Sequence, residues 1–527
     1  MVVIIGAKRD ILTTQVSNSG NYAKRLAKGS TIVLTALIFS EIIAIVMRAF
    51  LARSLSPEEY GLFFGVFTVV SFFTLFRDLG LNSSLIKHIP EFAFKKQHAK
   101  IKSSIASVAL IQSVAGFIIL AVLLFFSDHI AITIFGTLKA SIPLKILSLW
   151  FFVMIFVSLA QSAFNGLQNM FAYVLVNTIN ISLVLVLVVL IVGFFGYGTS
   201  GVSFAYVSAA VLTSVFSWAF FIERYPQVSG EKTSITKANT KKLFIFALPL
   251  VAAGSAGLII GYMDTIMIAM FRGLFDTGLY QAAQPMARIL WYFSTALTMV
   301  LFPIISEIWA KREKNTLKKA LHFLTKFSFI IILPIILVFI SFPEIVINLI
   351  FGPNYVAAAM AFRILCAGQV VYILYKLLLT AMLGVGKSIV NLTTMFAMSV
   401  VNFFGNAMLI PLYGIEGAAV ATFFSYLVGF ILIFHYSGKI IKFPAPAKSI
   451  FKSLGGGVLM LLLIIALKSV FVMSPWIEAF VVVIPSLLFY CVWILATKAI
   501  TKDDLRLIAK VVPIPKRLIA LVGKIIR

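Results

Sequence analysis

The chain has 527 residues, of which 61% are hydrophobic and only 12% are charged. This composition lies outside the range of soluble globular proteins and indicates a polytopic membrane protein. The net charge of +26 does not indicate a nucleic-acid partner, because the basic residues stand in short connections between apolar runs. The two cysteines both lie within apolar runs, which excludes a disulfide framework and a cysteine metal cluster.

Apolar runs long enough to cross a hydrocarbon layer of ~30 Å recur along the whole chain. The first, at 30–52, carries Glu41 and Arg48 on one helical face. A charge inside a span costs roughly 2.5–3.5 kcal/mol, so such residues usually face a wet cavity or a partner. We predict an all-α integral membrane protein with fourteen transmembrane helices, at 30–52, 61–85, 103–126, 143–165, 172–194, 201–222, 243–270, 277–305, 320–342, 355–383, 389–410, 416–436, 450–472 and 475–497.

Lysine and arginine are distributed unequally between the two sets of connections. Most stand in the N-terminal stretch, in the connections that follow even-numbered helices, and in the C-terminal tail. The connections that follow odd-numbered helices carry only Arg53, Lys139 and Arg272. Because positively charged loops tend to stay on the cytoplasmic side, we predict a multi-pass protein of the cell (plasma) membrane with both termini in the cytoplasm.

Matching residues recur at a nearly constant offset of about 216 positions, which indicates an internal repeat. Arg48 corresponds to Asp264, Gly61 to Gly278, and Phe135-Gly136 to Phe351-Gly352. Helices 1–6 and 7–12 are therefore predicted to be two parallel repeats, which form two lobes around a central cleft. The predicted organisation is a cytoplasmic lead-in (1–27), an N-lobe (28–222), a cytoplasmic linker (223–242), a C-lobe (243–437), two further helices (450–498) and a basic cytoplasmic tail (499–527).

Five stretches carry a family resemblance: ARSLSPEEYGLF at 52–63, DLGLNSSLIKHIPEF at 78–92, YMDTIMIAMFRGLFDTGLYQAAQ at 262–284, FGPNYVAAAMAFRILCAG at 351–368 and VNFFGNAMLIPLYGIEGAAVATFFSYL at 401–427. With them the chain resembles the polysaccharide-biosynthesis or oligosaccharide flippases of the multidrug/oligosaccharidyl-lipid/polysaccharide exporter superfamily. The resemblance implies transfer of isoprenoid phosphate- or pyrophosphate-linked saccharides from the cytoplasmic to the outer leaflet. In related lipid II flippases two extra C-terminal helices shape a groove for the lipid tail, which implies the same role for 450–497.

Basic residues within the predicted spans are candidates for substrate binding, because a phosphate headgroup needs cations along its route and arginine offers a planar fork of donors. Polar and aromatic side chains suited to sugars are Gln161, Asn165, Gln369, Tyr372 and Asn402. Lys326 and Lys468 lie near span ends and are expected to snorkel to the surface. The substrate-binding candidates are Arg48, Lys145 and Arg363 in the outward half, Arg288 at mid-span, and Lys376 nearer the cytoplasm.

Four other charged residues are candidates for gating or ion coupling: Glu41, Arg77, Asp78 and Asp264. Arg77 and Asp78 are adjacent in sequence, so each is expected to pair elsewhere, as a structural or gating element. Glu41 and Asp264 are buried carboxylates that could bind H⁺ or Na⁺. An alternative is that Arg48 and Asp264 form an interior ion pair.

Two other functions agree less well with the sequence than the flippase does. A multidrug exporter of the same superfamily would prefer acidic cavity residues, whereas this interior is net basic. A membrane glycosyltransferase or polysaccharide polymerase would need a sizeable loop with acidic or metal-binding residues, which the sequence lacks. No nucleotide or cofactor motif is present, since the glycine that a phosphate-binding loop requires before Lys387 is Ala381. The expected partners are a lipid-linked oligosaccharide, membrane lipids and other glycan-assembly proteins.

Overall fold

The computed structural model describes residues 19–443, 446–470, 475–501 and residue 504, and all the regular elements of this part are helical. Most of the predicted lead-in (1–27) and tail (499–527) lies outside the described residues. The elements, with η for 3₁₀ turns and for the π-helix η3, are α1 (Ser19–Ser54), α2 (Pro57–Phe72), α3 (Thr74–Asp78), α4 (Leu81–Phe94), α5 (His98–Phe125), α6 (Ser127–Phe135), η2 (Leu138–Ala140), α7 (Ser141–Gly166), α8 (Met170–Val188), η3 (Val189–Phe194), α9 (Thr199–Arg224), α10 (Pro226–Ser229), α11 (Lys237–Arg272), α12 (Leu274–Arg288), α13 (Leu290–Ala310), α14 (Lys314–Ser341), α15 (Pro343–Phe351), η4 (Pro353–Ala358), α16 (Ala359–Gly384), α17 (Ser388–Ile440), α18 (Ala447–Val470) and α19 (Pro475–Ala496).

Ten helical stretches of the described residues are long and apolar enough to cross a membrane. One of them, α17, has 53 residues and is bent at Gly414, where φ is 58° and ψ is −134°. It therefore has the length of two predicted spans, 389–410 and 416–436, joined at a bend that glycine permits. The all-helical membrane fold is confirmed, and the count of fourteen spans stays a prediction.

The second predicted span, 61–85, differs from the structure at its end. Its helix begins with a capping box, in which the Ser56 hydroxyl accepts from Glu59 N at 3.2 Å and Glu59 Oε2 accepts from Ser56 N at 3.2 Å. The helical path then stops at Asp78, because Leu79 and Gly80 both adopt left-handed backbone angles. Residues from Leu81 onward start a separate helix, α4, so the apolar run overstates the length of the span.

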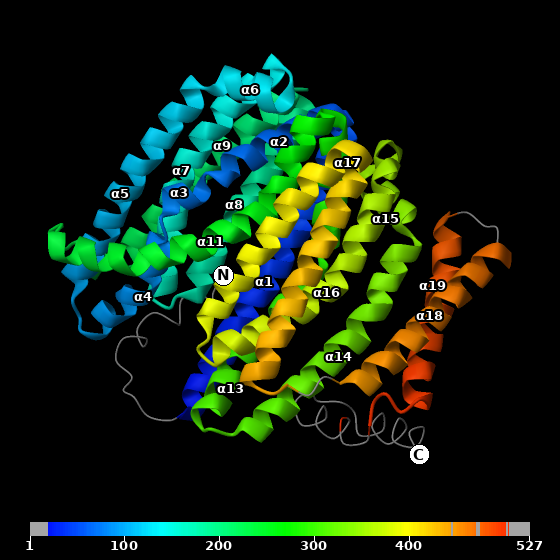
Figure 1. Cartoon of the computed structure of the whole chain (residues 1–527). Coiled ribbons are helices and arrows are strands. Elements are labelled where there is room, and N and C mark those ends of the chain that lie inside the picture. Colours follow the sequence, from blue (N-terminus) through cyan, green and yellow to red (C-terminus); the bar gives the residue numbers. More distant parts are fainter. Residues whose placement is uncertain (1–18, 444–445, 471–474, 502–503, 505–527) are drawn as a thin grey trace, which may run out of the picture.

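The largest hydrophobic core joins α1–α9 (the first half) to α11–α17 (the second half). It contains Val66 and Leu144 from the first half, and Tyr280 and Ile336 from the second. This core lies at the end of the molecule that contains the α1–α2 connection and α6, at the top of Figure 1. We call this end of the molecule the sealed end.

Toward the opposite end each half has a core of its own. The first half packs around residues such as Leu85 and Val108, joined by Leu243 and Ala247 from the beginning of α11. The second half packs separately, around residues such as Leu321. The two halves therefore share a large apolar core at one end of the molecule. Toward the other end the first-half core includes the beginning of α11, and the rest of the second half packs in a core of its own.

Two glycines allow the closest approach between the halves. A Cβ at Gly61 of α2 would lie 2.6 Å from the Gly278 nitrogen of α12 and would also overlap Leu274 O. A Cβ at Gly278 would in turn overlap Pro57 O. Only glycine permits this backbone-to-backbone contact, which lies within the sealed end. Gly61 and Gly278 are also a matched pair of the predicted repeat.

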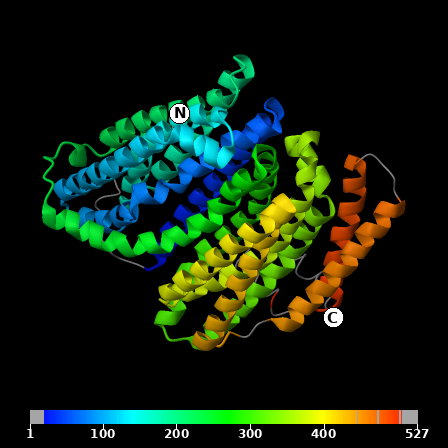
Figure 2. The same ribbon diagram turned by 45° about the horizontal axis from the view of Figure 1, so that its top comes forward.

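Helix α11 begins against the first half and ends within the second (Figures 1 and 2). Near its beginning the Ser84 hydroxyl donates to Leu243 O at 3.0 Å, and Lys242 pairs with Glu91 at 3.3 Å. Hydrogen bonds from His88 and Lys242 lower the pKa of the exposed Glu91 carboxyl, so this pair is ionised at neutral pH.

Helices α18 and α19 pack on each other, and α18 also packs on α14, at the side of the second half (Figure 2). At their base, the Lys326 ammonium of α14 pairs with Asp504 at 2.5 Å, and both side chains are almost fully buried. The expected snorkelling of Lys326 is wrong, because its charge is neutralised inside the protein. Lys468 is also held by the protein, through Ser341 O at 3.3 Å and Glu478 at 3.8 Å.

Replacing Lys326 with methionine should lower the free energy of unfolding by about 3 kcal/mol, because Asp504 would remain buried without its partner. Burial raises the Asp504 pKa, but Lys326 and Thr501 outweigh burial and the net pKa is lowered. The pair therefore stabilises the fold at neutral pH, and this contribution is lost as the pH falls through the lowered pKa, below about 4. Thermal unfolding of wild type and variant at several pH values measures this. Lys311→Met, which breaks an exposed pair with Glu307, should leave the melting temperature unchanged.

Candidate functional site

The most enclosed polar cluster surrounds Asp264, whose side chain is fully buried in α11. Its carboxylate accepts five hydrogen bonds, all from side chains of the second half. Oδ2 accepts from Tyr280 Oη at 2.6 Å, Thr422 Oγ1 at 2.8 Å and Gln284 Nε2 at 3.4 Å, and Oδ1 accepts from Asn406 Nδ2 at 2.6 Å and Asn402 Nδ2 at 3.0 Å.

Helical spacing and one bend assemble this cluster. Tyr280 and Gln284 are four residues apart on α12, and Asn402 and Asn406 are four apart on α17, so each pair projects from one face. The bend at Gly414 returns the second arm of α17 beside the first. It thereby places Thr422 within 3.2 Å of Asn402 Nδ2.

No ion pair between described residues includes Asp264. A buried carboxylate without a cation is costly, and hydrogen bonds to a charged group recover only about 1.5–3 kcal/mol each. The Asn406 Oδ1 atom is also buried without a hydrogen-bond partner. The cluster thus surrounds one buried carboxylate with two hydroxyls and three amide nitrogens, all of which donate to it.

Arg48 of α1 lies in the sealed end and reaches the second half. Its Nη1 donates to Gln281 O of α12 at 3.4 Å, and its guanidinium lies 4.1 Å from the centre of the Phe64 ring. Arg48 and Asp264 form no ion pair in the described part of the chain. The alternative of an interior Arg48–Asp264 bridge is therefore not seen in this conformation.

Arg288 is the cation nearest in sequence to the Asp264 cluster, one helical turn after Gln284 on α12. It donates to Gly261 O at 3.2 Å and lies 4.9 Å over the ring of Trp291. Trp291 stacks on Tyr372, with 4.8 Å between ring centres, and donates to Gln369 Oε1 at 2.5 Å.

Lys376 extends the α16 face that carries Gln369 and Tyr372, since the three are spaced by three and four residues. Its ammonium is half-buried and makes no hydrogen bond or ion pair with the described residues. Arg288 and Lys376 therefore flank an aromatic pair of the second half.

Lys145 and Arg363 are partly exposed, with 45% and 38% of their side-chain surface accessible. Lys145 pairs with Asp128 at 3.2 Å, and Arg363 pairs with Glu344 at 3.2 Å. Hydrogen bonds from Ser141 and Lys145 lower the pKa of the exposed Asp128 carboxyl, so the ion pair persists at neutral pH. The structure thus joins each of these two cations to a nearby carboxylate, and neither contacts Arg48 among the interactions of the described residues.

The remaining charged candidates lie in the first half. Arg77 is buried, donates to Phe151 O and stacks 5.0 Å over the Phe151 ring. Asp78 accepts from Gln112 Nε2 at 3.0 Å and from Asn82 N at 3.3 Å, across the helix break. Glu41 is half-buried in α1.

Sequence reasoning missed four partners of Asp264: Tyr280, Gln284, Asn406 and Thr422. It assigned Asn402 to the sugar-facing wall, whereas the structure places Asn402 on Asp264. The available signal was the spacing of Asn402 and Asn406, because two amides one turn apart in an apolar helix need a shared polar partner.

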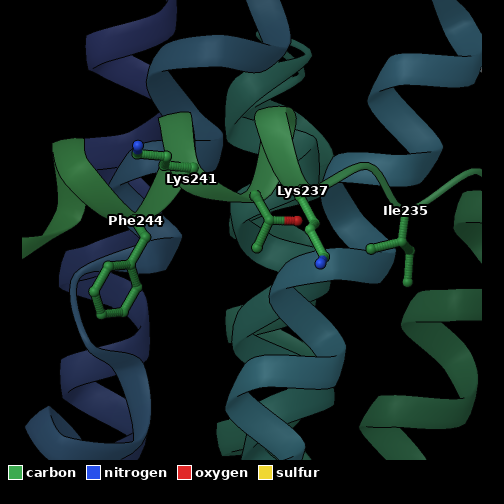
Figure 3. A pocket seen from close by; sticks show the side chains of 5 residues that line it. Ile235, Lys237, Lys241 and Phe244 are labelled. Atoms are coloured by element: carbon green, nitrogen blue, oxygen red, sulfur yellow. The ribbon is translucent and has the colours of Figure 1, made fainter.

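A shallow hollow of about 440 Å³ lies at the beginning of α11 (Figure 3). It is lined by none of the residues of the Asp264 cluster. Its lining combines Lys237, Thr240 and Lys241 with the apolar Ile235 and Phe244. None of these residues is acidic, so this hollow is not an additional carboxylate site.

Long apolar helices in two halves, joined at one end and enclosing a buried carboxylate, define a multi-pass membrane transporter. The polysaccharide biosynthesis protein family matches residues 26–309, more than half of the chain, and the chain belongs to this family. The MatE family also matches, over residues 249–408.

Three relatives illustrate the range of similar proteins. An uncharacterized membrane protein of Methanocaldococcus jannaschii is 26% identical over 434 residues, covering 80% of this chain and 86% of the relative. A probable low-salt glycan biosynthesis flippase of Haloferax volcanii is 22% identical and covers 54% of this chain and 61% of the relative. A putative O-antigen transporter of Shigella flexneri is 24% identical and covers 75% of this chain and 94% of the relative.

Solved structures share the fold. The lipid II flippase MurJ in an inward closed conformation matches with a TM-score of 0.73 and 15% identity, over 87% of this chain and 97% of MurJ. An inward-facing multidrug resistance transporter of the MATE family matches with a TM-score of 0.66 and 14% identity, over 78% of this chain and 98% of the transporter. At these identities the likeness concerns the fold.

Proposed function

We propose that this chain is a flippase that moves an isoprenoid phosphate- or pyrophosphate-linked oligosaccharide from the cytoplasmic to the outer leaflet, for the biosynthesis of a polysaccharide or other glycan. The observation that carries the proposal is the shared core at the sealed end together with the separate cores toward the other end. Such a molecule can expose its interior to one side and then, by closing the other end, to the opposite side. Family membership and the names of the relatives support the substrate class.

The proposed architecture has fourteen spans in two parallel lobes, 28–222 and 243–437, with two more helices at 450–498. Both termini are proposed to be cytoplasmic and the protein to reside in the plasma membrane, so the sealed end faces outward. The contact of Gly61 with Gly278 supports the repeat, because a two-fold axis brings matched residues together.

For substrate binding we propose that the phosphate group is attracted by cations along the interface of the lobes. Arg48 and Arg288 are half-buried. Arg48 donates to Gln281 O at 3.4 Å and Arg288 donates to Gly261 O at 3.2 Å, so each guanidinium keeps further N–H donors for a phosphate. Lys376 extends this route toward the cytoplasm, and Trp291 with Tyr372 offers aromatic faces for sugar. Lys145 and Arg363 would contribute only after leaving Asp128 and Glu344.

For energy coupling we propose that Asp264 binds H⁺ or Na⁺. Rotation of the Asn402 and Asn406 amides would turn their oxygens toward a cation held by the carboxylate, and Asn406 Oδ1 already has no partner. Occupancy of this cluster would fix the packing of α11 on α12 and α17, and both α11 and α12 contact the first half.

Reconstitution in liposomes tests the function directly. Purified protein, with a fluorescent lipid-linked oligosaccharide in one leaflet, should make that lipid accessible to a membrane-impermeant quencher on the other side. Protein-free liposomes give the background rate. An unchanged rate with folded protein would contradict the flippase, and a new glycosidic product would instead indicate a glycosyltransferase or polymerase.

A multidrug exporter is the second candidate, because the MatE family also matches residues 249–408. It predicts that cells expressing the protein tolerate cationic drugs better than cells with the empty vector. The flippase predicts no change in drug tolerance and a loss of surface glycan when the gene is deleted.

Replacing Arg48 with alanine should slow flipping at least tenfold, equivalent to about 1.4 kcal/mol, because the phosphate loses its cation at the sealed end. The liposome assay measures the rate. Arg272→Ala removes an exposed arginine that pairs with Asp276, and it should flip at the wild-type rate. Equal rates for Arg48→Ala and wild type would exclude Arg48 from the substrate path.

A further inference from the structure

Two tyrosine hydroxyls within the sealed end are buried without a hydrogen-bond partner. Tyr60 of α2 and Tyr355 of η4 both have side chains with 0% exposure, and neither hydroxyl is bonded to any described residue. Their rings meet edge to face, with 5.5 Å between centres. Tyr60 belongs to the first half and Tyr355 to the second, so this contact crosses the interface between them.

Arg48 lies beside this pair. Its guanidinium sits over Phe64, one helical turn after Tyr60 on α2, and can donate only to the oxygen of the Tyr60 hydroxyl. Arginine carries only donors, so it cannot accept the proton of a tyrosine hydroxyl. The interface therefore holds a half-buried guanidinium with one long hydrogen bond, and two buried hydroxyls whose protons have no acceptor among the described residues.

Buried polar groups in proteins are nearly always hydrogen-bonded, and exceptions tend to mark functional sites. Phenylalanine would fill the same space at either position without leaving a hydroxyl unpaired. The cluster has more N–H and O–H donors than acceptor atoms, and a phosphate offers only acceptors at the pH of a cell. The route proposed above brings such a group to this interface.

We propose that Tyr60 and Tyr355, together with Arg48, bind the phosphate or pyrophosphate of the lipid-linked sugar as it passes the sealed end. This inference rests on the proposed flippase function and adds two substrate-binding residues to it. In the sealed conformation the hydroxyls are unsatisfied. As the halves part, a phosphate enters between them, accepts from both hydroxyls and from the Arg48 fork, and stabilises the parted interface.

The two tyrosines differ in their surroundings. Arg48 sits over Phe64, one helical turn from Tyr60 on the same helix, whereas Tyr355 lies on η4 across the interface. A phosphate held by the guanidinium lies beside Tyr60. Tyr60 is therefore the stronger phosphate ligand of the pair.

The experiment compares flipping and thermal stability in Tyr60→Phe, Tyr355→Phe and the double variant. The double variant should flip at least tenfold more slowly than wild type, with a larger loss from Tyr60→Phe than from Tyr355→Phe. Its melting temperature should be equal or higher, because two unpaired buried hydroxyls have been removed. Tyr490→Phe is the matched control: its buried hydroxyl donates to Ile330 O at 3.2 Å, so this variant should lose stability and keep the wild-type rate.

A second measurement separates phosphate binding from packing. Wild type and the double variant are compared with pyrophosphate-linked and monophosphate-linked carriers of the same sugar, and the variant should lose more rate with the pyrophosphate. The proposal is overturned if the double variant flips within twofold of wild type, if both carriers are affected equally, or if the loss of rate accompanies a lower melting temperature. If wild type itself does not flip either lipid, it is the proposed function that fails.

Discussion

Replacing Gly61 with leucine should reduce flipping at least tenfold and leave the protein unable to close its sealed end. The leucine side chain would overlap Leu274 O and Gly278 N, which are backbone atoms and cannot rotate away. The overlap lies between the two halves and not inside either of them, so the halves can relieve it by separating. Alanine at the same position should give a smaller effect in the same direction, since its Cβ meets the same atoms.

Accessibility of the sealed end measures this effect. Leu279 is buried in the shared core, so a cysteine at this position, in a background without Cys366 and Cys491, should resist a membrane-impermeant maleimide. Gly61→Leu should increase its labelling from outside several-fold. Gly438→Ala is the control, because a Cβ there meets no neighbouring atom and should alter neither labelling nor flipping. Normal flipping by Gly61→Leu would show that the close contact is not required during transport.

The helices could be predicted from the sequence because lipid leaves few alternatives to a long apolar helix. Departures occur where single residues set the backbone. Leu79 and Gly80 adopt left-handed angles and stop the second span early. The kink of α17 at Gly414, in contrast, falls between two predicted spans. Hydropathy averaged over a window does not register such residues, so boundaries and breaks were less predictable than the existence of the helices.

The candidate site was partly predictable. Asp264 could be predicted as a candidate because a carboxylate in an apolar run is costly without a polar partner. The structure surrounds its carboxylate with hydrogen-bond donors. Its partners come from α12 and from both arms of α17, which no spacing in the sequence brings together. Lys145 and Arg363 were predicted to bind substrate from their depth in the spans and from their matching positions in the repeat. Their carboxylate partners, Asp128 and Glu344, precede them across short connections, outside the predicted spans.

Replacing Asp264 with asparagine should slow flipping at least tenfold and remove its dependence on a pH or Na⁺ gradient. Asparagine keeps the shape of the side chain but loses the charge, and its NH₂ group would face donors such as Asn402 Nδ2 and Asn406 Nδ2. The cluster would then have neither the negative charge for a cation nor a carboxylate to protonate. The liposome assay, run with each gradient imposed separately, measures both the rate and its ion dependence.

The matched control is Asp276→Asn, which removes a carboxylate of α12 that pairs with the exposed Arg272 at 3.1 Å. Surface pairs of this kind contribute little, so the control should keep the wild-type rate and ion response. Thr422→Val, which removes one donor and no charge, should give an intermediate rate and retain the ion response. These rates and ion responses are expected if the Asp264 carboxylate binds the ion and the neighbouring side chains only orient the carboxylate. An Asp264→Asn protein that still responds to the same gradient would place the coupling ion elsewhere in the chain.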